Sequence, residues 1–186
     1  MGIFINQSSI QTRLGISHVC STQLSHGTKE CGSQGQLPSI LFLVGLQHTI
    51  AWLRETGYSL CVFCNSAVET RDHLFFGCHY SEEIWRNLTK KLLGPRYTYE
   101  WSRVLELVSA NVLSTTIQFL LRYVFQALVH TIWIERNGRR HGSPHQDLRN
   151  IIKFVDKQVR NRISSLRGKG GKYLTQAMAN WFDSRA

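Results

Sequence analysis

The sequence predicts a mainly α-helical fold in which a small cysteine- and histidine-containing knuckle precedes a bundle of helices. Apolar residues recur at three- and four-residue steps through most of the second half of the chain, and no useful stretch alternates as a strand would. Three of the five cysteines lie within residues 61–78. A chain of 186 residues with 42% apolar residues can bury one core, which excludes wholesale disorder.

The first third of the chain has two parts. Residues 1–36 are rich in Ser, Thr, Gly and Gln without an apolar period, so they are unassigned and predicted to be disordered. Residues 38–56 are predicted to be helical, with Ser39 as N-cap and Gly57 as the stop. The apolar run in that helix is shorter than the roughly 20 residues that span a bilayer.

Two shorter helices are predicted after the cysteine cluster. Ser81 precedes Glu82 and Glu83, a pattern typical of an N-cap with acidic residues in the first helical turn. Gly94–Pro95 ends that helix. A second helix is predicted over residues 99–110.

The longest helix is predicted over residues 112–136, with Asn137–Gly138 ending it and a loop over 139–145. Polar and charged residues interrupt it, so a buried helix is preferred to a membrane span. Its apolar stripe comprises Leu113, Ile117, Leu120, Leu121, Val124, Leu128 and Ile132.

The remaining helices are predicted over residues 146–167 and 173–182. Residues 111–186 contain thirteen Lys and Arg against four Asp and Glu, which accounts for nearly all of the net charge of +10. Such an end favours a polyanion partner over a merely solvated surface once one basic face is identified. The helix over 146–167 and the linker after it provide that face through Arg149, Lys153, Lys157, Arg160, Arg167, Lys169 and Lys172.

Two aromatic residues lie among these cations. Phe154 and Tyr173 could stack on unpaired bases, but the preferred interpretation places both in the core.

The cysteine cluster has the pattern Cys-x2-Cys-x8-His-x4-Cys, formed by Cys61, Cys64, His73 and Cys78. Three thiolates and an imidazole are the donors of a tetrahedral structural Zn²⁺ site, and a fully protein-supplied set leaves no position for a catalytic water. His79 is the rival fourth ligand, and buried thiols without a metal are the alternative.

The neighbours of the four donors carry two further expectations. Glu69, Arg71 and Asp72 are expected to balance one another in solvent. Gly77 is expected to adopt backbone angles that turn the chain back toward the site.

These residues resemble a known family, the zinc-binding domain at the C-terminal end of plant non-LTR (LINE-type) retrotransposon reverse transcriptases. Upstream, the positions that loosely resemble the helix preceding that domain are Leu46, Thr49, Leu53 and Gly57. The segment IWIERNGRRHG (132–142) resembles a Trp-x-Glu-Arg-Asn stretch that follows it. The matching positions of the domain itself are Cys61, Cys64, Glu69, Thr70, His73, Leu74, Phe75, Phe76, Cys78, Ile84 and Trp85.

The resemblance implies a zinc-binding domain over residues 37–95 and a basic helical region over 96–186. It implies structural zinc and binding of RNA or DNA through the phosphate backbone, with other retroelement proteins as further partners. The chain lacks the aspartate pair that would hold polymerase metal ions, so no enzyme is expected and the protein is interpreted as a detached C-terminal piece.

Two other functions compete with nucleic-acid binding. One is a scaffold that binds another protein through the apolar stripe of 112–136, and the other is a retroelement remnant without selected function. No secretion signal is recognised at the N-terminus, so an intracellular protein is expected, in the nucleus rather than the cytoplasm, with no membrane partner.

Overall fold

The computed structural model describes residues 59–166 and 172–185, without the side chains of Lys172 and Tyr173. The predicted disordered segment 1–36 and the predicted helix 38–56 lie outside the described residues. So do Arg167 and Lys169 of the predicted basic face.

The mainly helical prediction is confirmed. Within the described ranges there is no strand, only one isolated bridge between Leu60 and Val68. The knuckle, residues 61–78, precedes the helices as expected, and it consists of irregular chain and one π-helical turn. The elements are η1 (His73–Gly77), α3 (His79–Leu93), η2 (Gly94–Arg96), α4 (Trp101–Ser109), α5 (Thr115–Arg140), α6 (Leu148–Leu166) and α7 (Lys172–Asp183).

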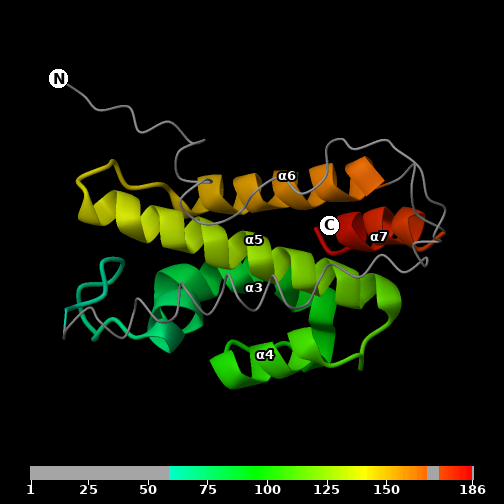
Figure 1. The fold of residues 1–186 in the computed structure, drawn as a ribbon, viewed down its shortest axis with the longest axis horizontal. Helices are drawn as coiled ribbons and strands as arrows, with labels where there is room; N and C mark the ends of the chain where they lie inside the picture. The colour runs from blue at the N-terminus through cyan, green and yellow to red at the C-terminus, as the bar shows by residue number, and fades with distance from the viewer. Residues whose placement is uncertain (1–58, 167–171, 186) are drawn as a thin grey trace, which may run out of the picture. The chain divides into compact units, whose positions relative to one another are not determined.

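Helix α5 organises the core. It packs against α3, α4, α6 and α7, and Figure 1 shows it running between α6 on one side and α3 and α4 on the other. By length and composition α5 is apolar enough to cross a membrane, but half of its most apolar window is buried inside the protein. Five of the predicted stripe residues are fully buried, which makes α5 a core helix: Leu120, Leu121, Val124, Leu128 and Ile132.

The start of α3 differs from the prediction. Ser81 is not the N-cap, because the helix already begins at His79 and Cys78 occupies the cap position with an extended backbone. The buried Ser81 hydroxyl instead donates to the carbonyl of Cys78 within the first turn. The chain enters the helix directly from the cysteine cluster, so the position of Cys78 decides where α3 starts. Gly94 ends α3 as predicted, with a φ of 55° that favours glycine.

The end of α5 also differs. The prediction that Asn137–Gly138 ends this helix is wrong, since α5 continues to Arg140. Gly138 has helical geometry because tertiary ion pairs hold the last turn: Arg136 and Arg140 both bond to Glu69. Tertiary contacts here outweigh the weak helical preference of Asn and Gly.

Five aromatic side chains form the core beneath the knuckle. Phe76 contacts Trp85, Trp101 and Phe125, with ring centroids 5.0, 5.6 and 5.9 Å away. Phe75 contacts Trp101 at 5.8 Å. Aromatic pairs at this spacing contribute about 0.5–1.5 kcal/mol each beyond the burial of their area. The apolar residues that follow His73 therefore anchor the knuckle to α3, α4 and α5.

Candidate metal centre

The first two cysteines lie on a closed loop. The Cys61 amide donates to the carbonyl of Ala67, and the Asn65 amide donates back to the carbonyl of Cys61, both at 2.8 Å. Asn65 adopts a φ of 53°, a left-handed conformation that Asn tolerates better than most residues. This tight turn points the thiols of Cys61 and Cys64 toward the same side, as the Cys-x2-Cys spacing predicts.

The other two donors lie at the ends of a widened helical turn. Thr70 begins it, since its hydroxyl accepts from the His73 amide at 3.2 Å. The Cys78 amide donates to the carbonyl of His73 at 2.6 Å, across the five-residue step that defines a π turn. That step leaves His73 and Cys78 on the side of the turn near Cys61 and Cys64, while Leu74, Phe75 and Phe76 are buried in the core.

The four predicted ligands come together. The Sγ atoms of Cys61, Cys64 and Cys78 and a ring nitrogen of His73 all lie within 4.8 Å of one another. Zn–S bonds of about 2.3 Å give a tetrahedron with edges of about 3.8 Å, so this spacing fits one zinc ion. The Cys64 Sγ lies 3.3 Å from the His73 Nε2, which identifies Nε2 as the nitrogen facing the site. His79 is exposed and is not part of this group, so the four donors are those the spacing predicts.

The three thiols differ in pKa because they hydrogen-bond to one another and to their neighbours. The Cys78 thiol hydrogen-bonds to Cys61, which lowers the pKa of Cys61 to about 5 and, together with burial, raises the pKa of Cys78 above its ordinary value. Hydrogen bonding from Ser66 lowers the pKa of Cys64 to about 7. A divalent cation stabilises all three thiolates at once. The donor set therefore suits zinc, and the protein would supply all four ligands of a structural site.

The expectation that Glu69 is solvated is wrong, because this residue is buried. Its side chain is 1% exposed and accepts from the guanidinium of Arg136, at 2.6 Å to Nη2 and 3.1 Å to Nε. Arg140 adds a third contact at 3.0 Å and also donates to the hydroxyl of Ser59. The two Arg residues come from the end of α5, so this buried ion pair ties the knuckle to the core helix. Arg71 does pair with the exposed Asp72 as expected.

A second connection runs through Arg139. Its guanidinium lies 4.8 Å from the ring centroid of Phe63 and 4.6 Å from that of Tyr80, and it bonds to Glu135 at 2.7 Å. Glu135 also accepts from the amide of Gln146, while the Tyr80 hydroxyl donates to the Gln146 carbonyl. The knuckle, the end of α5 and the approach to α6 are thereby joined. From the sequence, the Glu-Arg-Asn segment showed only a resemblance, and this role of Arg139 was not predicted.

Gly77 serves the site in another way than expected. It lies in the π turn and is not among the glycines with positive φ. A Cβ there would lie 3.3 Å from the backbone oxygen of Asp72 and 3.8 Å from the His73 Nδ1. The missing side chain, and not an unusual backbone angle, lets the turn close over His73.

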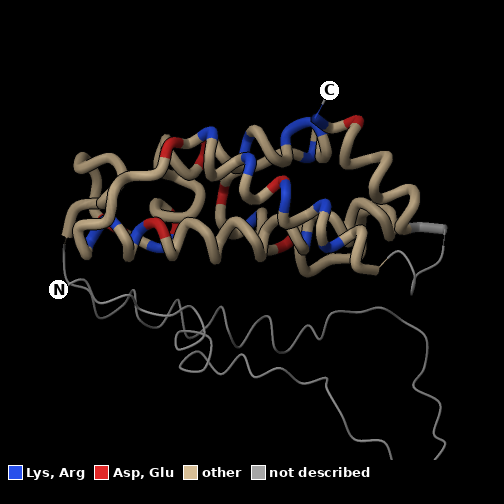
Figure 2. The backbone as a smooth tube through the Cα atoms, turned by 90° about the horizontal axis from the view of Figure 1, so that it is seen from above, with Lys and Arg blue, Asp and Glu red and all other residues tan. Residues whose placement is uncertain are grey.

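Part of the predicted basic face lies exposed on α6. Arg149, Lys153 and Lys157 are exposed, whereas Arg160 forms an ion pair with Asp156 at 2.7 Å. Figure 2 shows Lys and Arg positions along the helices with Asp and Glu positions between them. The core interpretation of Phe154 is wrong, because this side chain is 50% exposed.

Comparisons with known proteins identify one region of the chain. No curated protein and no solved structure matched the sequence. A family model described as zinc-binding in reverse transcriptase matches residues 44–85, a range that includes all four clustered donors. The chain thus contains a zinc-binding module similar to the zinc-binding region of reverse transcriptases.

Proposed function

We propose that this chain is the structural zinc-binding module of a protein derived from a plant LINE-type retroelement, and that it binds RNA or DNA without sequence specificity. Zinc holds the knuckle on the helical bundle, and the exposed face of α6 contacts phosphates. Residence in the nucleus would bring the protein to such a partner.

The observation that carries the proposal is the exposed face of α6. Arg149, Lys153 and Lys157 recur every four residues and so lie on one side of the helix, opposite the buried Val155. Phe154 adds an exposed aromatic ring beside Lys153. Cations spaced along a helix suit a phosphate backbone, and an exposed ring can stack on an unpaired base.

A structural zinc is favoured over a catalytic one by the donor set. Four protein ligands leave no position at which the ion could activate water. The matched region of reverse transcriptases is a zinc-binding one, and the expectation that this chain is no enzyme stays a prediction.

The scaffold alternative has less support. It required an exposed apolar stripe on α5, and the stripe residues from Leu120 to Ile132 are fully buried, while Leu113 and Ile117 are half-buried. A partner protein would find little of that stripe to contact.

The test is the salt dependence of binding. Zinc-loaded full chain is titrated into fluorescent single-stranded RNA and into duplex DNA between 50 and 200 mM salt, and log K against log salt should be linear with a negative slope of about 0.7–0.9 per phosphate contact. Lys153→Gln should make that slope less steep by about 0.7–0.9, the value of one phosphate contact. The matched control is Arg103→Gln, because Arg103 is an exposed cation on α4, away from α6. Affinity that does not change with salt would overturn the proposal.

A further inference from the structure

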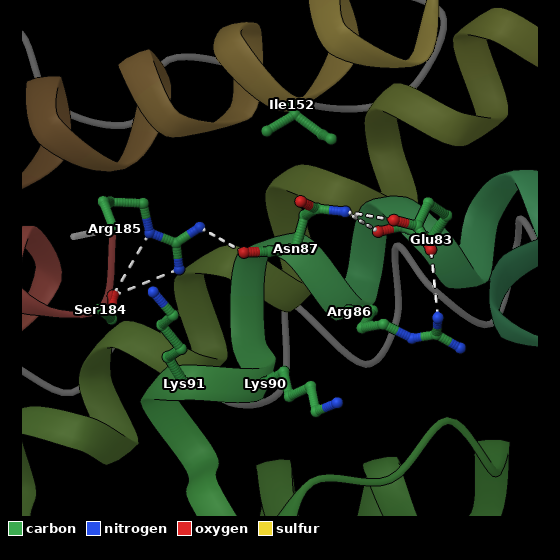
Figure 3. Close-up of a pocket in the computed structure, with 8 residues that line it drawn as sticks. All are labelled: Glu83, Arg86, Asn87, Lys90, Lys91, Ile152, Ser184 and Arg185. Atoms are coloured by element: carbon green, nitrogen blue, oxygen red, sulfur yellow. Dashed lines mark hydrogen bonds and ion pairs between the residues drawn. The ribbon is translucent and has the colours of Figure 1, made fainter.

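A second cationic surface lies along helix α3. An open groove of about 410 Å³ is formed where α3, α6 and the residues after α7 meet, and Figure 3 shows the side chains that line it. Its cationic lining residues are Arg86, Lys90, Lys91 and Arg185, and Glu83 is the one carboxylate among the lining residues.

The carboxylate in the groove is already engaged. Glu83 bonds to Arg86 at 3.3 Å and to the amide of Asn87 at 2.8 Å, and Arg86 is bound further by Glu82. Lys90 and Lys91 are exposed, and within residues 59–166 and 172–185 neither has an ion-pair partner. Both lysines therefore line the groove without an ion-pair partner in the described part of the chain, and Figure 3 shows Lys91 extending toward Arg185 and Lys90 extending on the side of Arg86.

Arg185 adds a cation that is held in place. It donates to the carbonyls of Asn87 and Leu88 and to the hydroxyl of Ser184, and it lies 4.2 Å from the ring centroid of Trp181. All three acceptors are neutral.

Burial lowers the pKa of Arg185 more than the negative charge of Asp156 raises it, and the two side chains form no ion pair. Asp156 is instead bound to Arg160 at 2.7 Å and to the indole nitrogen of Trp181 at 2.8 Å. The lowered pKa of Arg185 is the sign of a positive charge that lacks full compensation. An anion that entered the groove would supply that compensation.

We propose that this groove binds the phosphate backbone of the nucleic-acid strand, with Lys90 and Lys91 each contacting one phosphate and Arg185 as a fixed cation at the edge of the groove. The proposal rests on the proposed function, which it extends from α6 to α3. Ile152 of α6 lines the same groove and directly precedes Lys153, so the two cationic surfaces adjoin. The volume lies within the range of about 300–1,000 Å³ that is usual for ligand sites.

Lys90 and Lys91 could instead serve only to stabilise the end of α3. Both lie in the last turn of α3, where the negative end of the helix dipole favours cations. That role predicts a small loss of stability on substitution and no change in binding. The phosphate role predicts the opposite, since exposed lysines can be replaced with little effect on folding.

The experiment compares charge-neutralised variants of the zinc-loaded full chain by fluorescence anisotropy with a single-stranded oligonucleotide. Lys90→Gln/Lys91→Gln should lower the salt slope by two contacts, which corresponds to about 25- to 60-fold weaker binding at 0.1 M salt. Arg103→Gln should leave the slope unchanged, and urea unfolding should show that all variants are folded. Polyglutamate serves as a non-phosphate polyanion.

The outcomes separate the two proposals. Loss of binding in Lys153→Gln/Lys157→Gln but not in Lys90→Gln/Lys91→Gln overturns the groove and leaves the α6 interface intact. No binding by the unsubstituted chain overturns the proposed function. If polyglutamate binds as tightly as the oligonucleotide and depends equally on Lys90 and Lys91, the groove recognises acidic peptides and the phosphate assignment is wrong.

Discussion

Neutralising Glu69 should destabilise the zinc module strongly, although this residue is not a metal ligand. Glu69→Gln keeps the shape of the side chain and removes its charge. Arg136, whose side chain is 3% exposed, then stays buried without a counter-ion. Removing one partner of a buried ion pair costs about 3–5 kcal/mol, most of it from the uncompensated charge that is left.

The assay is urea unfolding of the zinc-loaded protein at constant free zinc, followed by tryptophan fluorescence, to which Trp85 and Trp101 beneath the knuckle contribute. The free energy of unfolding should fall by about 3–5 kcal/mol in Glu69→Gln. The matched control is Glu82→Gln, which breaks an ion pair with the exposed Arg86 and should cost at most about 1 kcal/mol.

A double-mutant cycle isolates the ion pair. Arg136→Met alone leaves Glu69 buried and unpaired except for Arg140, while the double variant removes both charges. The double variant should be more stable than the sum of the single effects implies, by about 1–3 kcal/mol. A loss in Glu69→Gln no larger than that in Glu82→Gln would refute the claim that this pair holds the knuckle on α5.

Two further predictions concern the metal centre. Gly77→Ala should destabilise the knuckle by about 1 kcal/mol or more, because its Cβ would meet the backbone oxygen of Asp72 at 3.3 Å. At Gly138 in α5, an added Cβ would make only an ordinary contact with the side chain of Ser143, at 3.5 Å, so Gly138→Ala should instead stabilise the protein by up to about 1 kcal/mol. Equal effects in the two variants would contradict this expectation. Elemental analysis should find one zinc per chain, which is lost in Cys78→Ser and kept in His79→Ala; zinc loss in His79→Ala would mean that the ligand set is wrong.

The helices and the ligands were largely readable from the sequence because both depend on local spacing. Apolar residues at three- and four-residue steps, with cap and stop residues at the ends, predict helices, and all five described α-helices lie where helices were predicted. The Cys-x2-Cys-x8-His-x4-Cys pattern predicts its own geometry, since a short chain segment can bring its donors together only in a few ways.

Contacts between distant segments were not readable in this way. Glu69 and Arg136 are 67 positions apart, and the neighbours of Glu69 suggested a solvated charge. The ion pair of Glu69 with Arg140 holds the last turn of α5 beyond Gly138, where local preference predicted an end. Phe154 was assigned to the core because aromatic residues usually lie there, but its position on α6 faces away from the bundle.

The amino-acid sequence by itself determined the helical class, the four donors and the excess of positive charge, because each follows from residue type and short-range spacing. Only the tertiary structure decided which charged side chains form ion pairs with one another and which are exposed to solvent. Burial makes Glu69, Arg136 and Arg139 part of the scaffold, while Lys90, Lys91 and the α6 lysines stay exposed. A charge acquires its role from the dielectric and the partners around it, and folding alone brings those partners into contact.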